Sequence, residues 1–313
     1  MFPKSVYKTR RQILAKDIES GIILMLGNSE APANYQDNTY KFRQDSTFLY
    51  FFGIQDPDFA GVIDADKGED IIFGNDVSID DIIWMGPQKS VADKAAEVGV
   101  KKTKKLSDLS KYIKAAIKAG RKIHYIAPYR YQVKLFLSEL LGIPVGALQK
   151  HASVKLIKAA VSQRIVKDKY EIAEIDHACN IGYAMHYFVM QNCKPGVTEQ
   201  SLAGMMDGIA MSNGAGVSFA TILSQHGETL HNHDHSGIIT KGNLLTVDAG
   251  AENNNNYCSD FTRTMPCSGK FTTKQKEIYQ IVCDCNNMIF NLCRKNAFLR
   301  TGCRPQRSCH IDR

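Results

Sequence analysis

The sequence predicts an α/β fold in which short buried strands alternate with helices. In the first half, apolar runs at Gly21–Leu26, Phe48–Gly53 and Asp70–Phe73 are bounded by glycine, asparagine or aspartate, as buried strands commonly are. Segments of helical character lie between the runs, at Lys8–Glu19 and Ser90–Gly99. Strands that alternate with helices in this way are typical of an α/β domain.

The same punctuation predicts one more strand at Gly61–Ile63 and one more helix at Ser110–Ala119, which ends at Gly120. The chain has 313 residues, of which 44 % are hydrophobic and 23 % charged, so it is long enough for two ordinary globular domains. We place the boundary near residue 155, which predicts domains at residues 1–155 and 156–313.

The second half has a different pattern, with long helices around a β-rich block. Apolar Ile172, Ile175, Cys179 and Tyr183 recur at three- and four-residue spacing, as on one face of a helix. We predict helices at Val154–Met190, Thr198–Met211 and Gly269–Leu299, with β structure at Val217–Pro266.

Composition excludes several function classes. No run approaches 18 apolar residues, and Met1–Arg11 is not followed by the apolar core of a secretory signal, so we expect neither a membrane span nor a leader. The net charge of +7 comes without clustered basic and aromatic residues, which argues against nucleic acid. The nine cysteines form no CxxC pair, so we expect reduced thiols and a cytoplasmic protein.

Two aspartates are the first candidates for chemistry. Asp248 and Asp260 lie six residues either side of Asn254, inside a run of four asparagines that suits a hairpin turn. Folded there, the two would be cross-strand neighbours, and converging carboxylates bind divalent metals. The alternative is that one or both carboxylates cap turns or face solvent.

The segment QHGETLHNHDHS holds the second group of candidates. His231, His233 and His235 alternate, so on a strand they would share one face, where histidine can bind metal or transfer protons. A polar sheet face or a loop is the alternative.

Several motifs together resemble the creatinase/aminopeptidase P/prolidase family. VDAGAE followed by SDFTRTMP is similar to the strand pair that carries the family's metal-binding aspartates. GKFTTKQKEIYQIV is similar to the helix that follows, and FRQDSTFLYFFGI with DDIIWMGP resembles the family's amino-terminal domain. The resemblance implies a creatinase-type α/β domain followed by a partial pita-bread catalytic domain, and it favours aminopeptidase P, prolidase or creatinase over methionine aminopeptidase.

The resemblance also implies roles for single residues. Asp248 matches the aspartate that binds one metal, and Asp260 the one that bridges two. His231 matches the histidine that contacts substrate or assists proton transfer, and Phe219 and His233 are assigned to substrate binding. Two divalent ions are implied, manganese first, with zinc or cobalt as alternatives. The implied substrate is a peptide with proline at the second position, and a homodimer is expected.

The family completes its metal site with a histidine and two glutamates, and the tail RTGCRPQRSCHIDR, with His310, does not resemble those motifs. We therefore expect an incomplete catalytic domain, exposed apolar surface at Val217–Leu223 or Leu244–Val247, and a chain that is by itself a poor peptidase. The leading hypothesis is a Xaa-Pro aminopeptidase-like metallopeptidase. The alternatives are a Xaa-Pro dipeptidase, a non-enzymatic module that binds a peptide or protein, and a metal-free creatinase-like hydrolase.

Overall fold

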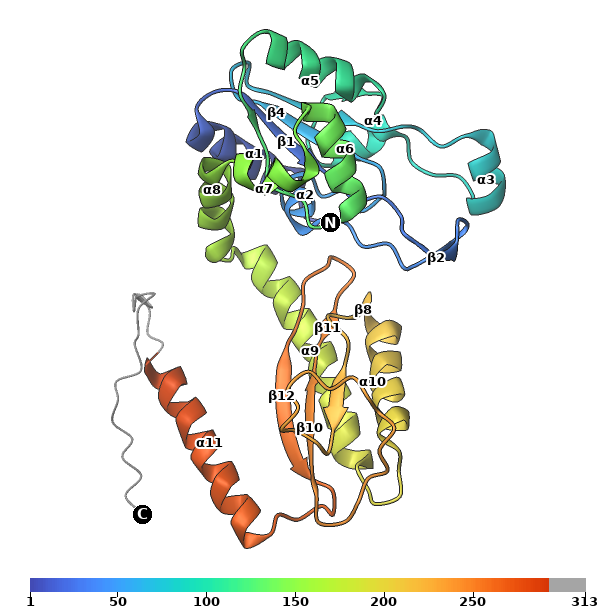
Figure 1. The fold of residues 1–313 in the computed structure, drawn as a ribbon, viewed down its shortest axis with the longest axis vertical. Helices are drawn as coiled ribbons and strands as arrows, with labels where there is room; N and C mark the ends of the chain where they lie inside the picture. Colours follow the sequence, from blue (N-terminus) through green and yellow to red (C-terminus); the bar gives the residue numbers. More distant parts are fainter. Residues whose placement is uncertain (293–313) are drawn as a thin grey trace. The chain divides into compact units, whose positions relative to one another are not determined.

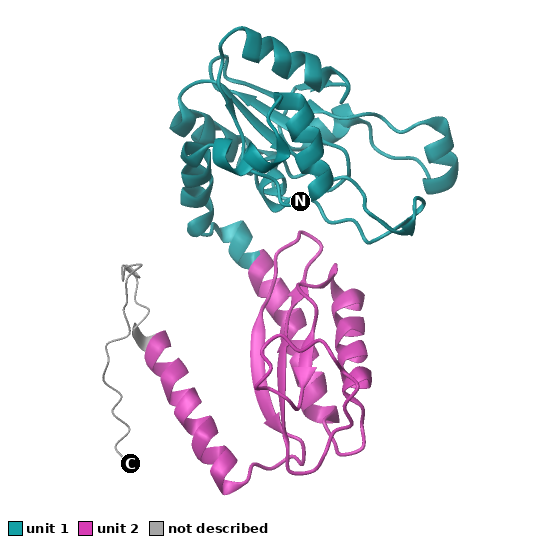
Figure 2. Cartoon of the chain, in the orientation of Figure 1, with its two compact units in different colours: residues 1–173 teal, residues 174–313 magenta. Residues whose placement is uncertain are grey.

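The computed structural model describes residues 1–292. The predicted tail around His310, with the last residues of the Gly269–Leu299 helix, lies outside them. The chain divides into two compact units, residues 1–173 and residues 174–313 (Figure 2). The predicted boundary near residue 155 would assign α8 (Val154–Ile165) to the second unit, whereas α8 packs against α1 (Lys4–Ile18) within the first.

The first unit is built on a five-stranded mixed sheet in the order β6-β5-β4-β1-β7. Neighbouring strands run antiparallel in the centre, and the edge pairs β5–β6 and β1–β7 are parallel. The strands are β1 (Ile22–Leu26), β4 (Ala60–Asp64), β5 (Glu69–Phe73), β6 (Lys102–Lys104) and β7 (Ile123–His124), and a small hairpin joins β2 (Pro32–Tyr35) to β3 (Asn38–Thr39).

Helices cover both faces of this sheet. Leu109 and Ile113 of α5 (Asp108–Lys118) and Leu137 of α6 (Tyr131–Leu141) pack with Ile22 and Val62 in one core. Figure 1 shows α5 and α6 beside this sheet. α1 and α2 contact the strands as well. The remaining helices of the unit are α2 (Ser46–Phe52), α3 (Ile79–Met85), α4 (Val91–Glu97), the 3-10 turn at Val145–Ala147, α7 (Leu148–His151) and α8.

The predicted strand at Phe48–Gly53 is wrong, because this run forms helix α2. The Asp45 side chain accepts hydrogen bonds from the backbone N–H groups of Thr47 and Phe48, which caps the helix start, and Gly53 ends it with a φ of 65°. Phe48 and Phe52 then lie one turn apart and stack, with ring centroids 5.4 Å apart. A short apolar run fits a buried strand and a buried helix equally well, and the capping residues decide.

The second unit packs two helices on a three-stranded antiparallel sheet in the order β12-β10-β9. Its core joins Met185 of α9, Met206 of α10, and Leu223, Leu245 and Val247 of the strands. Its elements are α9 (Lys169–Asn192, which begins in the first unit), α10 (Glu199–Asn213), β8 (Gly216–Val217), β9 (Ile222–Ser224), β10 (Leu244–Ala249), β11 (Ala251–Glu252), β12 (Phe261–Pro266) and α11 (Thr273–Leu292).

Two sequence predictions for this unit need correction. The predicted helix at Val154–Met190 is two helices, α8 and α9, separated at residues 166–168. The expected exposure of the β9 and β10 strands is wrong as well, because Leu223, Leu245 and Val247 are fully buried. β10 buries alternate residues, so one face meets the helices and the other carries Thr246 and Asp248. Thr198 caps α10 as predicted, accepting a hydrogen bond from the Ser201 N–H.

Candidate functional site

The asparagine turn determines which residues of β10 and β12 face each other. The Asn253 N–H donates to the Tyr257 carbonyl at 2.9 Å, and Asn256 adopts a left-handed φ of 62°. The turn is therefore centred on Asn255, one residue later than the sequence suggested. A shift of one residue in the centre changes every cross-strand partner by two residues.

The two aspartates are consequently diagonal neighbours. Asp248 faces Thr262 in the ladder, so the prediction that it faces Asp260 directly is wrong. The pairing continues past the strand end, where the Ser259 N–H donates to the Ala251 carbonyl at 2.9 Å. Asp260 is two residues from Thr262 and hence on the same face as Asp248, and such diagonal neighbours are about 7–8 Å apart.

The two carboxylates differ in their surroundings. Asp248 is half-buried, and its Oδ1 accepts a hydrogen bond from the Thr262 hydroxyl at 2.8 Å. Asp260 is exposed, in agreement with the alternative that one carboxylate faces solvent. Thr262 keeps the Asp248 carboxylate oriented along the sheet face that Asp260 shares.

The chemistry of these donors suits a hard divalent cation, because carboxylate oxygens are preferred ligands of such ions. Within residues 1–292 there is no group of three or more histidine, cysteine, aspartate or glutamate side chains arranged to hold a metal. The described part of the chain thus offers two carboxylates of a coordination sphere that takes about four to six donors.

The histidine segment is a loop, which is one of the alternatives that the sequence left open, so its histidines do not share a strand face. His231 and His233 lie between β9 and β10 without regular structure, and both are exposed. The loop is held by its polar residues instead, since Asn232 Nδ2 donates to Ser224 Oγ at 3.1 Å and the Asp234 N–H donates to Asn232 Oδ1 at 3.0 Å.

Phe219 lies half-buried in the segment between β8 and β9. Its neighbour Ser218 forms hydrogen bonds to both segments that carry the aspartates. The Ser218 N–H donates to the Gly250 carbonyl at 3.0 Å, and Ser218 Oγ donates to the Ser259 carbonyl at 2.9 Å. The backbone that carries Phe219 is therefore fixed beside the residues that flank Asp248 and Asp260.

Helix α9 supplies residues that the sequence interpretation missed. Glu174 accepts hydrogen bonds from the side chains of Asn253 and Asn255, and His186 Nε2 is 3.1 Å from the Ala249 carbonyl. Between them, Gly182 lies so close to Ser259 that a Cβ would be 2.6 Å from its Oγ.

These three residues belong to a stripe of four-residue spacing, Glu174, Ala178, Gly182 and His186, which the sequence already contains. The predicted stripe is on the other side of the helix, where Ile172 is 49 % and Tyr183 66 % exposed. Small residues in such a stripe indicate close helix–strand contact. The sequence interpretation weighted only large apolar residues.

Burial of His186 disfavours its protonated form. Burial lowers its pKa, while hydrogen bonding to the Ala249 carbonyl acts in the opposite direction and does not overcome the effect of burial. Its ring meets Phe261 edge-on, with centroids 6.0 Å apart.

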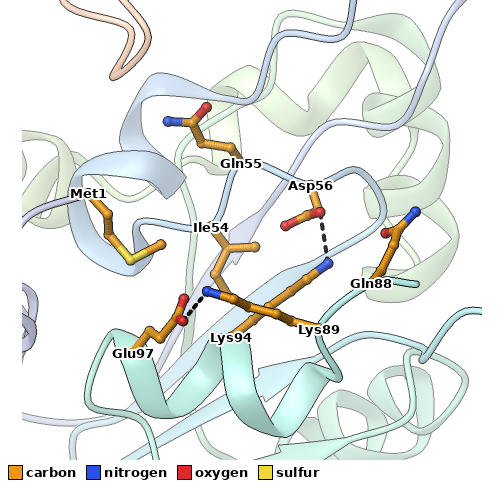
Figure 3. Close-up of a pocket in the computed structure, with 8 residues that line it drawn as sticks. All are labelled: Met1, Ile54, Gln55, Asp56, Gln88, Lys89, Lys94 and Glu97. Atoms are coloured by element: carbon orange, nitrogen blue, oxygen red, sulfur yellow. Dashed lines mark hydrogen bonds and ion pairs between the residues drawn. The ribbon is translucent and has the colours of Figure 1, made fainter. Parts of the chain in front are cut away.

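A separate hollow of about 560 Å³ lies in the first unit (Figure 3). Asp56 pairs with Lys94 at 2.7 Å across it, and Lys89 pairs with Glu97. Each of these lysines has a carboxylate partner, so the hollow offers little net charge to a ligand, and no predicted site residue lines it.

Two family models match the chain. The aminopeptidase P amino-terminal domain matches residues 7–125, and metallopeptidase family M24 matches residues 173–301. The second match contains every candidate site residue named above.

Curated relatives include the Xaa-Pro aminopeptidase of Escherichia coli, 26 % identical over 88 % of this chain and 65 % of the relative. A probable Xaa-Pro aminopeptidase of Chaetomium globosum is 28 % identical over 84 % of this chain and 44 % of the relative. The chain thus spans about half to two thirds of the length of these relatives.

Among solved structures, an E. coli aminopeptidase P variant in complex with substrate has a TM-score of 0.81 and 25 % identity, covering 94 % of this chain and 69 % of that one. A zinc-substituted form of the E. coli enzyme in complex with product has a TM-score of 0.80 over the same shares of the two chains.

Proposed function

The chain belongs to the creatinase/aminopeptidase P family, and from that premise we propose that it is a Xaa-Pro aminopeptidase-like metallopeptidase, which hydrolyses the peptide bond preceding proline. The observation that carries the proposal is the β10–β12 hairpin, where Asp248 and Asp260 occupy the same face of the ladder within the M24 match. Relatives named Xaa-Pro aminopeptidase support the substrate class.

We assign metal binding to Asp248 and Asp260. Bound divalent ions would polarise the scissile carbonyl and lower the pKa of water. We propose manganese as the native metal, with zinc or cobalt as alternatives. Thr262 orients the Asp248 carboxylate through its 2.8 Å hydrogen bond, so that the oxygen is presented on the face shared with Asp260.

We assign substrate contact to the exposed loop residue His231, which would bind the peptide or exchange a proton with it. Phe219 and His233 are proposed to line the substrate site. Support for Phe219 comes from Ser218, whose two bonds fix the adjacent backbone beside Gly250 and Ser259.

The test is cleavage of a tripeptide with proline at position 2 by a version of the chain extended to the length of its relatives, measured with added Mn²⁺ beside a matched peptide with alanine there. We expect release of the first residue only from the proline peptide, and loss of release in Asp248→Asn. A preparation that binds two metal ions and yet leaves the proline peptide intact contradicts the proposal.

One observation favours a second candidate, a non-enzymatic module that binds a peptide. The described residues bring no third metal ligand to the two aspartates. Metal analysis of the purified chain separates the candidates, because a peptide-binding module binds the proline peptide with no metal and cleaves nothing.

We further propose a homodimer in a reducing, cytoplasmic setting. The six described cysteines are free thiols, as expected for such a compartment.

Helix α3 buries none of its residues, and it exposes Ile83 at 72 % and Trp84 at 87 %, an apolar surface that a second copy would cover. No described helix is both long and apolar enough to cross a membrane.

A further inference from the structure

Helix α9 contacts the aspartate hairpin at three successive levels. Glu174 binds the asparagine turn, Gly182 meets Ser259, and His186 meets the end of the ladder at Ala249. Residues spaced four apart lie on one face of a helix, so Glu174, Gly182 and His186 all face the hairpin. This helix face runs along the hairpin from the asparagine turn to the end of the ladder beside Asp248.

His186 contacts the hairpin at the residues next to the two proposed metal ligands. Its Nε2 is 3.1 Å from the carbonyl of Ala249, the residue that follows Asp248. Ala249 pairs with Phe261, the residue that follows Asp260, and the Phe261 ring lies edge-on to the imidazole. One side chain therefore contacts the ladder pair adjacent to both aspartates.

The tautomer follows from these partners. A carbonyl oxygen only accepts, so Nε2 carries the proton and donates to Ala249. Nδ1 is then a bare acceptor, and it has no hydrogen-bond partner among the described residues although the side chain is only 4 % exposed. A phenyl or leucyl side chain would fill this space without burying an unpartnered nitrogen, so the contribution specific to histidine here is the bond to Ala249.

We propose that His186 is a positioning residue for the metal site, which holds the Ala249–Phe261 pair so that the Asp248 and Asp260 carboxylates keep a fixed separation. The proposal rests on the proposed function for the identity of the ligands. In this role His186 contacts neither metal nor substrate. It acts only through the backbone that carries the two aspartates.

The variants are His186→Phe, which keeps a ring beside Phe261 but removes the donor, and His186→Gln, whose amide N–H can replace Nε2–H. His124→Phe is the matched control, because His124 is a histidine of the first unit that is 3 % exposed and bonded through its ring to Ser153 Oγ at 2.8 Å. All are made in the full 313-residue chain.

The first readout is the Mn²⁺ dissociation constant from electron paramagnetic resonance, with Asp248→Asn identifying the site. We expect His186→Phe to weaken binding about tenfold, the lower end for a residue that supports a ligand. His186→Gln should stay within about threefold of the wild type. His124→Phe should lower the melting temperature and leave Mn²⁺ affinity unchanged.

The second readout uses metal-free protein, so it holds even where Mn²⁺ binding is too weak to measure. Amide hydrogen exchange at residues 248–250 and 260–262 should accelerate in His186→Phe, recover in His186→Gln and stay unchanged in His124→Phe. Unchanged exchange in His186→Phe overturns the proposal. Failure of peptide cleavage would contradict the proposed function and would leave this conclusion standing, because neither readout involves peptide.

Discussion

The Asn253 side chain is fully buried, and its Nδ2 donates to Glu174 Oε2 at 2.6 Å. Its Oδ1 accepts from the N–H groups of Asn255 and Tyr257, both at 3.0 Å. Asn253 therefore shapes the turn and also joins it to α9. This double role explains why the turn is centred on Asn255. A turn centred on Asn254 would bring a residue other than Asn253 to the position that donates a hydrogen bond to the Glu174 carboxylate.

We expect Asn253→Ala to destabilise the chain by about 2–3 kcal/mol, because the substitution leaves two backbone N–H groups and one oxygen of the half-buried Glu174 carboxylate without their partner. Asn180→Ala, at an exposed position of α9, should not destabilise the chain, because alanine favours the helix at least as well as asparagine. Urea unfolding of both variants measures the difference. Equal effects would mean that the anchor to Glu174 contributes nothing specific.

Gly250 is required for close packing between the two aspartate segments. A Cβ on Gly250 would lie 1.8 Å from the Ser259 carbonyl oxygen and 2.6 Å from Ser218 Oγ. We expect Gly250→Ala to cost about 1–3 kcal/mol and to weaken metal binding, because the segments must separate where Asp248 and Asp260 converge.

Gly204→Ala is the control for that variant. Gly204 lies in α10 with nothing within 4 Å of its added Cβ, so alanine should stabilise the chain by about 0.5–1 kcal/mol. Thermal unfolding of both variants, followed by Mn²⁺ titration, checks the pair. A Gly250→Ala chain as stable as the wild type would show that the backbone relaxes without cost.

The sequence could predict the elements of the site but not their alignment. Asp248 and Asp260 were found from their position around the asparagine run, and that local pattern does place them on one hairpin. Their pairing depends on Glu174, which is 79 residues from Asn253 in sequence and enters only through tertiary contact. The same limit applies to Phe48–Phe52, whose apolar run is a helix because Asp45 and Gly53 cap it. The resemblance to a known family predicted the function more specifically than the residue pattern alone did.

We expect the 313-residue chain to bind Mn²⁺ weakly through Asp248 and Asp260. Two carboxylates leave most of the coordination sphere to water, and ions held by few fixed ligands dissociate readily. Asp248→Asn and Asp260→Asn should each reduce binding to background, whereas Glu252→Gln, in the neighbouring strand β11, should retain it.

Isothermal titration with Mn²⁺ before and after chelation measures these affinities. Tight binding that survives in the Asp248→Asn chain would place the metal elsewhere and would refute the assignment. Weak binding that is lost in both aspartate variants and kept in Glu252→Gln supports it.

Trp84 is the single tryptophan of the chain and is 87 % exposed, so it reports directly on the proposed dimer. A tryptophan in water emits at longer wavelength than one at a protein interface. If a second copy covers α3, the emission should shift to shorter wavelength as the protein concentration rises, together with a doubling of the mass measured by light scattering. Ile83→Ser removes apolar area from the same helix, where Ile83 is 72 % exposed, and should weaken association.

Ile117→Ser is the matched control for Ile83→Ser, because Ile117 is a partly exposed isoleucine of α5, at 42 %. It should leave both the emission and the mass as in the wild type. A dimer that forms without any change in Trp84 emission would place the interface away from α3. A chain that stays monomeric at every concentration would contradict the dimer itself, and α3 would then be an apolar surface for some other partner.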